Sequence, residues 1–179
     1  MPALGFLCSV SCPGSIIIKI YDAVRALRDA GVVVCGGFHS PMEHECLDLL
    51  LRGIQPVVLC AATGLRHISL DDLAGAVSRC GHLVALSPFG DEVERASPWH
   101  GSFRNDIVVA MSEVVFVPHA IQGGKVFGNV LRAINRGQVV LTLDDKANEH
   151  LMAVGAHPIS VAGVVSCAMQ LGGKSSAGP

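Results

Sequence analysis

The stretch FRNDIVVAMSEVVFVPHA, residues 103–120, contains the pattern that decides the fold. An expected helix over residues 103–112 runs directly into VVFVP, an apolar strand at residues 114–118. A strand that is apolar at every position is typical of a parallel sheet covered on both faces. The stretch therefore indicates an α/β protein, and it places the charged Arg104 just ahead of a buried strand.

The same alternation of strands and helices extends to both sides of this stretch. Strands are expected at 5–10, 32–37, 56–62, 82–87, 114–118, 138–143 and 157–160. Helices are expected at 15–30, 40–52, 69–80, 103–112, 124–136, 145–152 and 161–170, with a loop over 88–101. This order predicts a Rossmann-like doubly wound sandwich, in which a mostly parallel sheet is covered by helices on both faces. Residues 1–170 are expected to form a single domain and residues 171–179 a disordered tail.

Two of the expected helices carry clear N-terminal signals. Ser40 is followed by Pro41 and Glu43, the spacing of a capping box. Ser69 precedes Asp71 and Asp72, whose charges suit the first turn of a helix.

Composition limits the function. The 179 residues are 50% hydrophobic and 16% charged, yet no apolar run reaches the length that spans a bilayer. The N-terminus lacks the features of a signal peptide, so a cytoplasmic protein is expected. A net charge of −2 indicates no general affinity for nucleic acid. Seven cysteines, an odd number, argue against a disulfide framework. Mean hydropathy of +0.49 favours a homodimer or larger assembly, because it leaves more apolar surface than a monomer usually hides.

In doubly wound folds, ligands bind beyond the carboxyl ends of the strands. Here those positions hold SVSCPGS (9–15), GGFHSPMEHE (36–45), ATGLRH (62–67) and HAIQGGK (119–125). Small residues and hydroxyls ahead of a helix can bind a phosphate through backbone N–H groups. We therefore expect a phosphate-bearing ligand at this edge, with Arg104 and Lys125 supplying charge. The candidate binding residues are Ser9, Ser11, Gly14, Ser15, Gly36, Gly37, His39, Ser40, Arg104, Asn105, Gly123, Gly124 and Lys125.

Common cofactor motifs are missing from the sequence. The first loop has no G-x-G-x-x-G, and Cys35-Gly36-Gly37 stands where a dinucleotide fold would have an acidic residue. GGKVFGN does not have the order of a Walker A loop. No short Cys pair supports a metal site, so neither a cofactor nor a metal is expected. A Cys12 nucleophile at a helix N-terminus is conceivable, although no third orienting residue is identifiable.

Four segments carry a resemblance to a known family. They are LRDAGVVVCGGFHSPMEHECLDLLLRG (27–53), QPVVLCAATGL (55–65), FRNDIVVAMSEVVFVPHA (103–120) and GNVLRAINRGQVVLTL (128–143). They resemble the Rossmann-like domain of the DNA-processing protein A family, and the third is similar to its Phe-x-x-Arg-Asn-x-Ile-x-x-x-x-Ser signature. The wider superfamily includes the lonely-guy phosphoribohydrolases. The resemblance implies a nucleotide or single-stranded DNA as ligand.

The chain departs from both groups at functional positions. The family's Gly-Ser-Arg after the first strand is replaced by residues 9–12, Ser-Val-Ser-Cys. His39, Ser40 and Glu43 occupy the loop where the family has an arginine and an aspartate. Binding of single-stranded DNA is therefore expected to be weak. No carboxylate lies between Glu113 and Asp144, so the glutamate of the phosphoribohydrolase motif is absent.

Three functions stay open on the sequence alone. The first is a stand-alone binding domain for a nucleotide or another phosphate-bearing ligand. The second is a hydrolase of nucleotides or nucleoside phosphates, and the third is a structural domain with a vestigial pocket. Arg104 could instead be structural, capping carbonyls or pairing with Glu94, Asp106 or Glu113. Trp99 and His100, in the expected loop, could stack on a base or form a packing lid.

Overall fold

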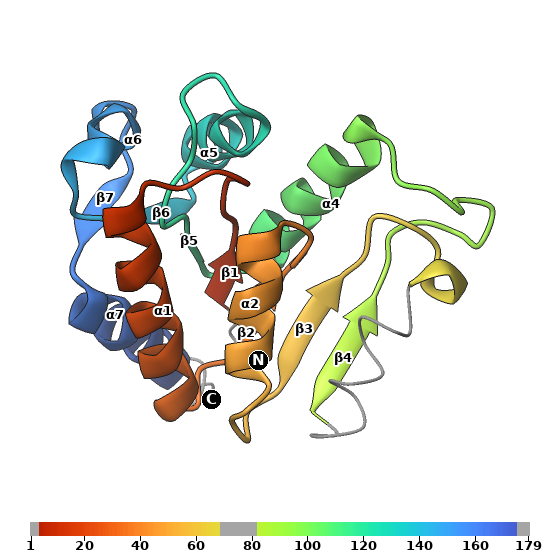
Figure 1. Ribbon diagram of the computed structural model, residues 1–179, viewed down its shortest axis with the longest axis horizontal. Coiled ribbons are helices and arrows are strands. Elements are labelled where there is room, and N and C mark those ends of the chain that lie inside the picture. Colours follow the sequence, from red (N-terminus) through yellow and green to blue (C-terminus); the bar gives the residue numbers. More distant parts are fainter. Residues whose placement is uncertain (1–3, 69–81, 175–179) are drawn as a thin grey trace.

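Figure 1 shows the computed structural model, which describes residues 4–68 and 82–174. These residues form a parallel sheet in the order β4-β3-β2-β1-β5-β6-β7. The strands are β1 (Leu4–Phe6), β2 (Val34–Gly36), β3 (Val57–Cys60), β4 (Leu83–Leu86), β5 (Val114–Phe116), β6 (Val139–Leu143) and β7 (His157–Ile159). The α-helices are α1 (Gly14–Asp29), α2 (Pro41–Leu50), α4 (Pro98–Met111), α5 (Lys125–Asn135), α6 (Glu149–Ala153) and α7 (Val161–Lys174). Short 3₁₀ turns are η1 (Leu65–His67) and η2 (Lys146–Asn148).

Helices cover both faces of the sheet, as the apolar strands predict. On one face α1 packs against α2 and α7, and on the other α4 packs against α5 (Figure 1). Alternate side chains of a strand enter opposite cores, because successive residues point to opposite faces. In β5, Val114 and Phe116 join the core under α1, while Val115 joins the core under α4. The Rossmann-like sandwich predicted from the sequence is therefore confirmed.

The strand order reverses between β1 and β5. The chain passes from β1 through α1 to β2 on one side, and later returns through α4 to β5 on the other side. In folds of this kind the two loops that leave such neighbouring strands separate and open a crevice for ligands. We call the region at the carboxyl ends of β1 and β5, where loop 7–13 meets loop 117–124, the switch-point crevice.

Helix α4 begins five residues earlier than the sequence analysis expected. Ser97 is its N-cap, and its hydroxyl accepts from the His100 N–H at 3.3 Å. In return, His100 Nδ1 accepts from the Ser97 N–H at 3.0 Å. Histidine thus takes the place that glutamate or glutamine usually has in a capping box, which hid the signal. The expected start at residue 103 is wrong, and Arg104 lies in the second turn of the helix rather than at its beginning.

Other boundaries differ by a few residues. The first strand ends at Phe6 rather than residue 10, so 7–13 is connecting chain. Helix α7 extends to Lys174, four residues beyond its expected end. The helix expected after Ser69 and the last five residues lie outside the described residues. Among the described residues, no helix is long and apolar enough to cross a membrane.

Candidate functional site

Ser9 joins the two sides of the switch-point crevice. Its backbone N–H donates to the His119 carbonyl at 3.1 Å. Its buried hydroxyl accepts from the Ile121 N–H at 3.0 Å. The sequence suggested this hydroxyl as a ligand contact, and the structure places it in a bond between two loops. Ser9 therefore sets the distance between the loop after β1 and the loop after β5.

Two helices that start at the crevice have N-termini without side-chain caps. The N-cap of α1 is Pro13 and that of α5 is Gly124, and neither makes a side-chain cap bond. Helices α2 and α4, by contrast, both start with complete capping boxes. Within the described parts of the chain, the N–H groups of Gly14, Ser15 and Lys125 have no acceptor. Helices α1 and α5 thus begin with free backbone donors and positive helix ends, and each follows one of the two loops that Ser9 joins.

The remaining glycine and serine candidates of these loops also lie nearby. Gly123 has a positive φ of 74° in the turn before α5, a conformation that favours glycine. The exposed Ser11 lies in the loop that leads to α1. Both residues are on the chain segments that border the crevice.

The loop after β2 is different, because a side chain of the protein fills it. The Glu43 carboxylate is buried and accepts three backbone N–H groups. Its Oε1 accepts from Cys8 at 3.0 Å, and its Oε2 accepts from His39 at 3.0 Å and from Ser40 at 3.1 Å. The Ser40 hydroxyl is used as well, since it accepts from the Glu43 N–H at 3.2 Å. The predicted capping box is confirmed, and the N–H groups of this predicted anion loop already hold a carboxylate.

Phe38 shapes this loop. Its φ of 43° is unusual for a residue with a side chain. Its buried ring stacks on Phe6, with 6.2 Å between ring centroids. Gly36 leaves room for that ring, since a Cβ there would lie 3.0 Å from it. A left-handed turn of this kind directs successive N–H groups to one point, here Glu43. The His39 side chain, in contrast, is exposed.

Arg104 is only 6% exposed and lies at the ends of β2 and β3. Its Nε donates to Asn105 Oδ1 at 2.8 Å, and its Nη1 donates to the Cys60 carbonyl at 3.3 Å. The guanidinium lies so close to Gly37 that a Cβ on that residue would overlap it. Burial lowers the pKa of the Arg104 guanidinium, and the negative charge of Glu43 opposes this shift. Arg104 and Gly37 therefore contact each other beyond the ends of β2 and β3.

The carboxylates suggested as alternative partners of Arg104 do not pair with it. In the chain as described, Arg104 forms no ion pair with Glu94, Asp106 or Glu113, and Asp106 instead pairs with Arg132 at 3.1 Å.

Asn105 faces α5. Its Nδ2 donates to Asn129 Oδ1 at 3.4 Å, and Asn129 Nδ2 donates to Asp106 Oδ1 at 3.0 Å. The structure thus places Asn105 in a polar seam between α4 and α5 and not among the loops.

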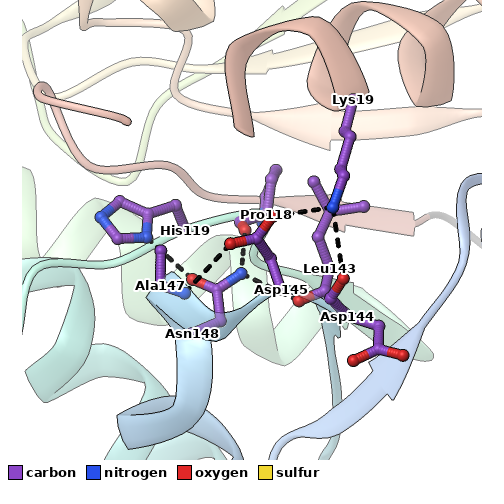
Figure 2. A network of polar contacts seen from close by, with 8 residues as sticks. All are labelled: Lys19, Pro118, His119, Leu143, Asp144, Asp145, Ala147 and Asn148. Atoms are coloured by element: carbon purple, nitrogen blue, oxygen red, sulfur yellow. Dashed lines mark hydrogen bonds and ion pairs between the residues drawn. The ribbon is translucent and has the colours of Figure 1, made fainter. Parts of the chain in front are cut away.

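His119, which the sequence analysis did not select, is the most informative side chain at the crevice. It follows β5 and is only 7% exposed. Its Nδ1 lies 2.8 Å from Asn148 Oδ1 (Figure 2). Asn148 Nδ2 donates to the carbonyls of Pro118 at 2.7 Å and Leu143 at 3.0 Å, which fixes the amide orientation. His119 must therefore donate from Nδ1, so the neutral ring keeps Nε2 as an acceptor.

Figure 2 also shows how α1 is tied to the neighbouring loop. Lys19 Nζ lies 2.7 Å from Asp145 Oδ2 and 3.4 Å from the Asp144 carbonyl. The Lys19 hydrogen bond lowers the pKa of the Asp145 carboxyl, and the Ala147 N–H adds to this effect. Lys19 is the positively charged residue nearest in sequence to the uncapped N-terminus of α1, and its ammonium group is already paired with Asp145.

The sequence did contain a signal for His119. This residue directly follows the apolar strand 114–118 and opens 119–125, one of the loops expected to bind a phosphate. A single histidine, however, has no pattern that separates a ligand contact from a core residue. Its importance depends on Asn148, which lies 29 residues away on another segment.

Trp99 lies in the first turn of α4 and not in a loop. It is 62% exposed, and its ring stacks on Phe103 with centroids 5.2 Å apart. Phe89 packs against the same pair. The three rings form an aromatic cluster at the carboxyl edge of the sheet.

Comparison with known proteins gives the fold. No protein-family model and no curated protein matches the chain. DNA processing protein A from Streptococcus pneumoniae matches at a TM-score of 0.78 and 18% identity, over 93% of this chain and 61% of that chain. DNA processing protein A from Helicobacter pylori, described for its single-stranded DNA binding mode, matches at a TM-score of 0.79 and 13% identity. The match covers 94% of this chain and 80% of that chain.

Proteins that bind or carry the molybdenum cofactor have a similar fold and length. The molybdenum cofactor binding protein from Rippkaea orientalis matches at a TM-score of 0.67 and 14% identity, over 95% of this chain and 96% of that chain. The present chain thus spans about three-fifths of the Streptococcus pneumoniae protein and nearly all of the cofactor binding protein. The chain has the Rossmann-like fold of DNA processing protein A, as the resemblance in its sequence implied.

Proposed function

We propose that the chain binds a phosphate-bearing small molecule in the switch-point crevice. The observation that carries this proposal is the contrast between helix starts: α1 and α5 are uncapped, whereas α2 and α4 have complete capping boxes. A helix N-terminus attracts anions through free N–H groups and the helix dipole. Gly14, Ser15 and Lys125 would hold the phosphate through their free N–H groups, and Ser11, Gly123 and Gly124 would line its approach.

His119 extends the recognition beyond phosphate. Its acceptor Nε2, held in place by Asn148, suits a hydroxyl or amine N–H of the ligand. A nucleotide has both groups, and so do other phosphorylated small molecules. The resemblance in length and fold to a molybdenum cofactor binding protein supports a small ligand over a long polymer.

Binding is favoured over hydrolysis by the state of the nearby carboxylates. Glu43 is buried and bonded to three N–H groups, and Asp145 is paired with Lys19. A general acid or base must reach the bond that is cleaved, and these two carboxylates, unlike the exposed Asp144 beside Asp145, are already bonded within the chain.

The substitution Gly14→Asp tests the proposal. A side chain fits at this position, since a Cβ there meets nothing within 4 Å. A carboxylate in the first turn stabilises a helix, so the melting temperature should stay constant or rise. The same charge repels a phosphate, so affinity should fall by about tenfold or more. Isothermal titration with inorganic phosphate and a panel of nucleoside monophosphates measures both the affinity and the preferred ligand.

Gly14→Asn is the matched control, because it has the same shape without the charge. It should bind within about threefold of the unchanged protein. Equal affinity of the aspartate and asparagine variants would place the phosphate away from α1 and contradict the proposal.

A second candidate ligand, single-stranded DNA, is favoured only by the aromatic cluster. Exposed rings such as Trp99 can stack on bases at about 1–3 kcal/mol per base. Because few cations line the loops, we expect weak binding of an oligothymidylate that decreases steeply with salt. Fluorescence anisotropy of Trp99→Ala should show roughly tenfold weaker oligonucleotide binding and unchanged mononucleotide binding. Tight binding at high salt would contradict this expectation.

A further inference from the structure

Two cysteines lie in contact in the loop after β1. Cys8 Sγ and Cys12 Sγ are 3.4 Å apart, within hydrogen-bond distance of each other. Residues 7–13 belong to no helix or strand. The N–H groups of Leu7, Cys8 and Ser9 are bonded to Phe116, Glu43 and His119, and Cys12 follows this bonded part of the loop. A disulfide requires about 2.05 Å between the sulfurs, so oxidation draws the two sulfurs together from 3.4 Å.

The two thiols differ in accessibility and acidity. Cys8 is buried, with 3% of its surface exposed, whereas Cys12 is half-buried. The hydrogen bond between them lowers the pKa of the Cys12 thiol and raises that of Cys8. A more acidic, accessible thiol beside a protected partner is the arrangement in which one thiol attacks and the other resolves.

The other described cysteines lack this arrangement. Burial raises the pKa of Cys35 to about 12 and that of Cys60 to about 11. Burial also raises the pKa of the Cys46 thiol. In residues 4–68 and 82–174, no other pair of sulfurs lies within hydrogen-bond distance. Cys167 is half-buried, but no other described sulfur lies within hydrogen-bond distance of it. A disulfide within one chain should therefore form between Cys8 and Cys12.

We propose that Cys8 and Cys12 form a reversible thiol–disulfide pair that reacts with low-molecular-weight disulfides. The Cys12 thiolate attacks one sulfur of glutathione disulfide, forms a mixed disulfide and releases one glutathione thiolate. That thiolate takes the proton of Cys8, whose sulfur then attacks Cys12 Sγ and expels the second glutathione. Two protein thiols are oxidised by two electrons, and one disulfide is reduced to two thiols.

The position of the pair connects it to α1. Cys12 directly precedes Pro13, the N-cap of that helix, and its Sγ contacts the Ser9 carbonyl at 3.4 Å. Cys8 donates its N–H to Glu43. Oxidation would thus close a small covalent ring at the start of the loop that Ser9 ties to β5. This inference does not depend on the proposed ligand.

Peptide mapping tests the pair directly. Trypsin releases residues 1–19 as one peptide, and this peptide contains Cys8 and Cys12 but no other cysteine. The full chain is incubated with glutathione disulfide, quenched in acid, alkylated with N-ethylmaleimide and digested. We expect peptide 1–19 to lose two hydrogen atoms and to carry no alkyl group. Dithiothreitol added before alkylation should restore two alkyl groups.

Single substitutions separate the two roles. In Cys8→Ser, Cys12 should keep one glutathione, because no thiol resolves the mixed disulfide. In Cys12→Ser, Cys8 should stay reduced and free of glutathione. Cys167→Ser is the matched control, because it removes a cysteine outside the pair. Its peptide 1–19 should form the same disulfide as the unchanged chain does. Two alkyl groups on 1–19 after oxidation of the unchanged chain would overturn the proposal, as would a disulfide from this peptide to another cysteine.

Discussion

Replacing Glu43 with alanine is expected to lower the free energy of unfolding by about 3–5 kcal/mol. The carboxylate accepts the N–H groups of Cys8, His39 and Ser40, and its removal leaves buried donors without partners. It also removes the negative charge that offsets the desolvation of Arg104. Urea denaturation gives the free energy, and the melting temperature should fall by about 6–20 °C.

Glu43→Gln should lower the free energy of unfolding by less than Glu43→Ala does. One end of the amide can still accept hydrogen bonds, but its NH₂ group must face one of the three N–H donors. Asp48→Ala is the control, because Asp48 is exposed on the same helix and should change stability by less than about 0.5 kcal/mol. If Glu43→Ala costs no more than Asp48→Ala, the carboxylate does not hold these loops together.

Glu43 shows which part of the site the sequence could predict. Its bond to the Ser40 N–H follows from a spacing of three residues, and that capping box was recognised from the sequence. Its bond to Cys8 joins residues 35 positions apart and depends on β1 lying beside β2. The sequence therefore predicted a loop rich in free N–H groups. Only the fold shows that one carboxylate accepts hydrogen bonds from both strand ends.

The overall fold was predictable because the sheet repeats one strong pattern. Apolar strands such as VVFVP specify a buried parallel sheet wherever they occur. The start of α4 was not predictable in the same way, since His100 replaces the usual acidic partner in the capping box. That shift of five residues moved Arg104 from a helix start, where it could face a ligand, into a buried helical turn.

Arg104→Ala is expected to lower the free energy of unfolding by roughly 2–4 kcal/mol, through a lost hydrogen bond to Cys60 and a cavity over Gly37. Gly37→Ala should also destabilise, because the new Cβ overlaps the guanidinium. In the double variant that overlap is absent, so the two losses should not add and the coupling should be about 0.5–3 kcal/mol. Gly101→Ala, on the same helix with nothing within 4 Å of a Cβ, should instead stabilise slightly.

Ligand titration of the same variants decides between the two roles of Arg104. Because the guanidinium is bonded to Asn105 and to the Cys60 carbonyl at the end of β3, we expect Arg104→Ala to change affinity for a nucleoside monophosphate by less than about threefold. Arg104→Lys should regain part of the stability, since the ammonium still balances Glu43 but cannot bond to Asn105 and Cys60 together. A loss of affinity of tenfold or more with little loss of stability would instead make Arg104 a ligand contact. The phosphate site would then extend from the crevice towards β2, where Glu43 would have to give up its backbone donors to admit it.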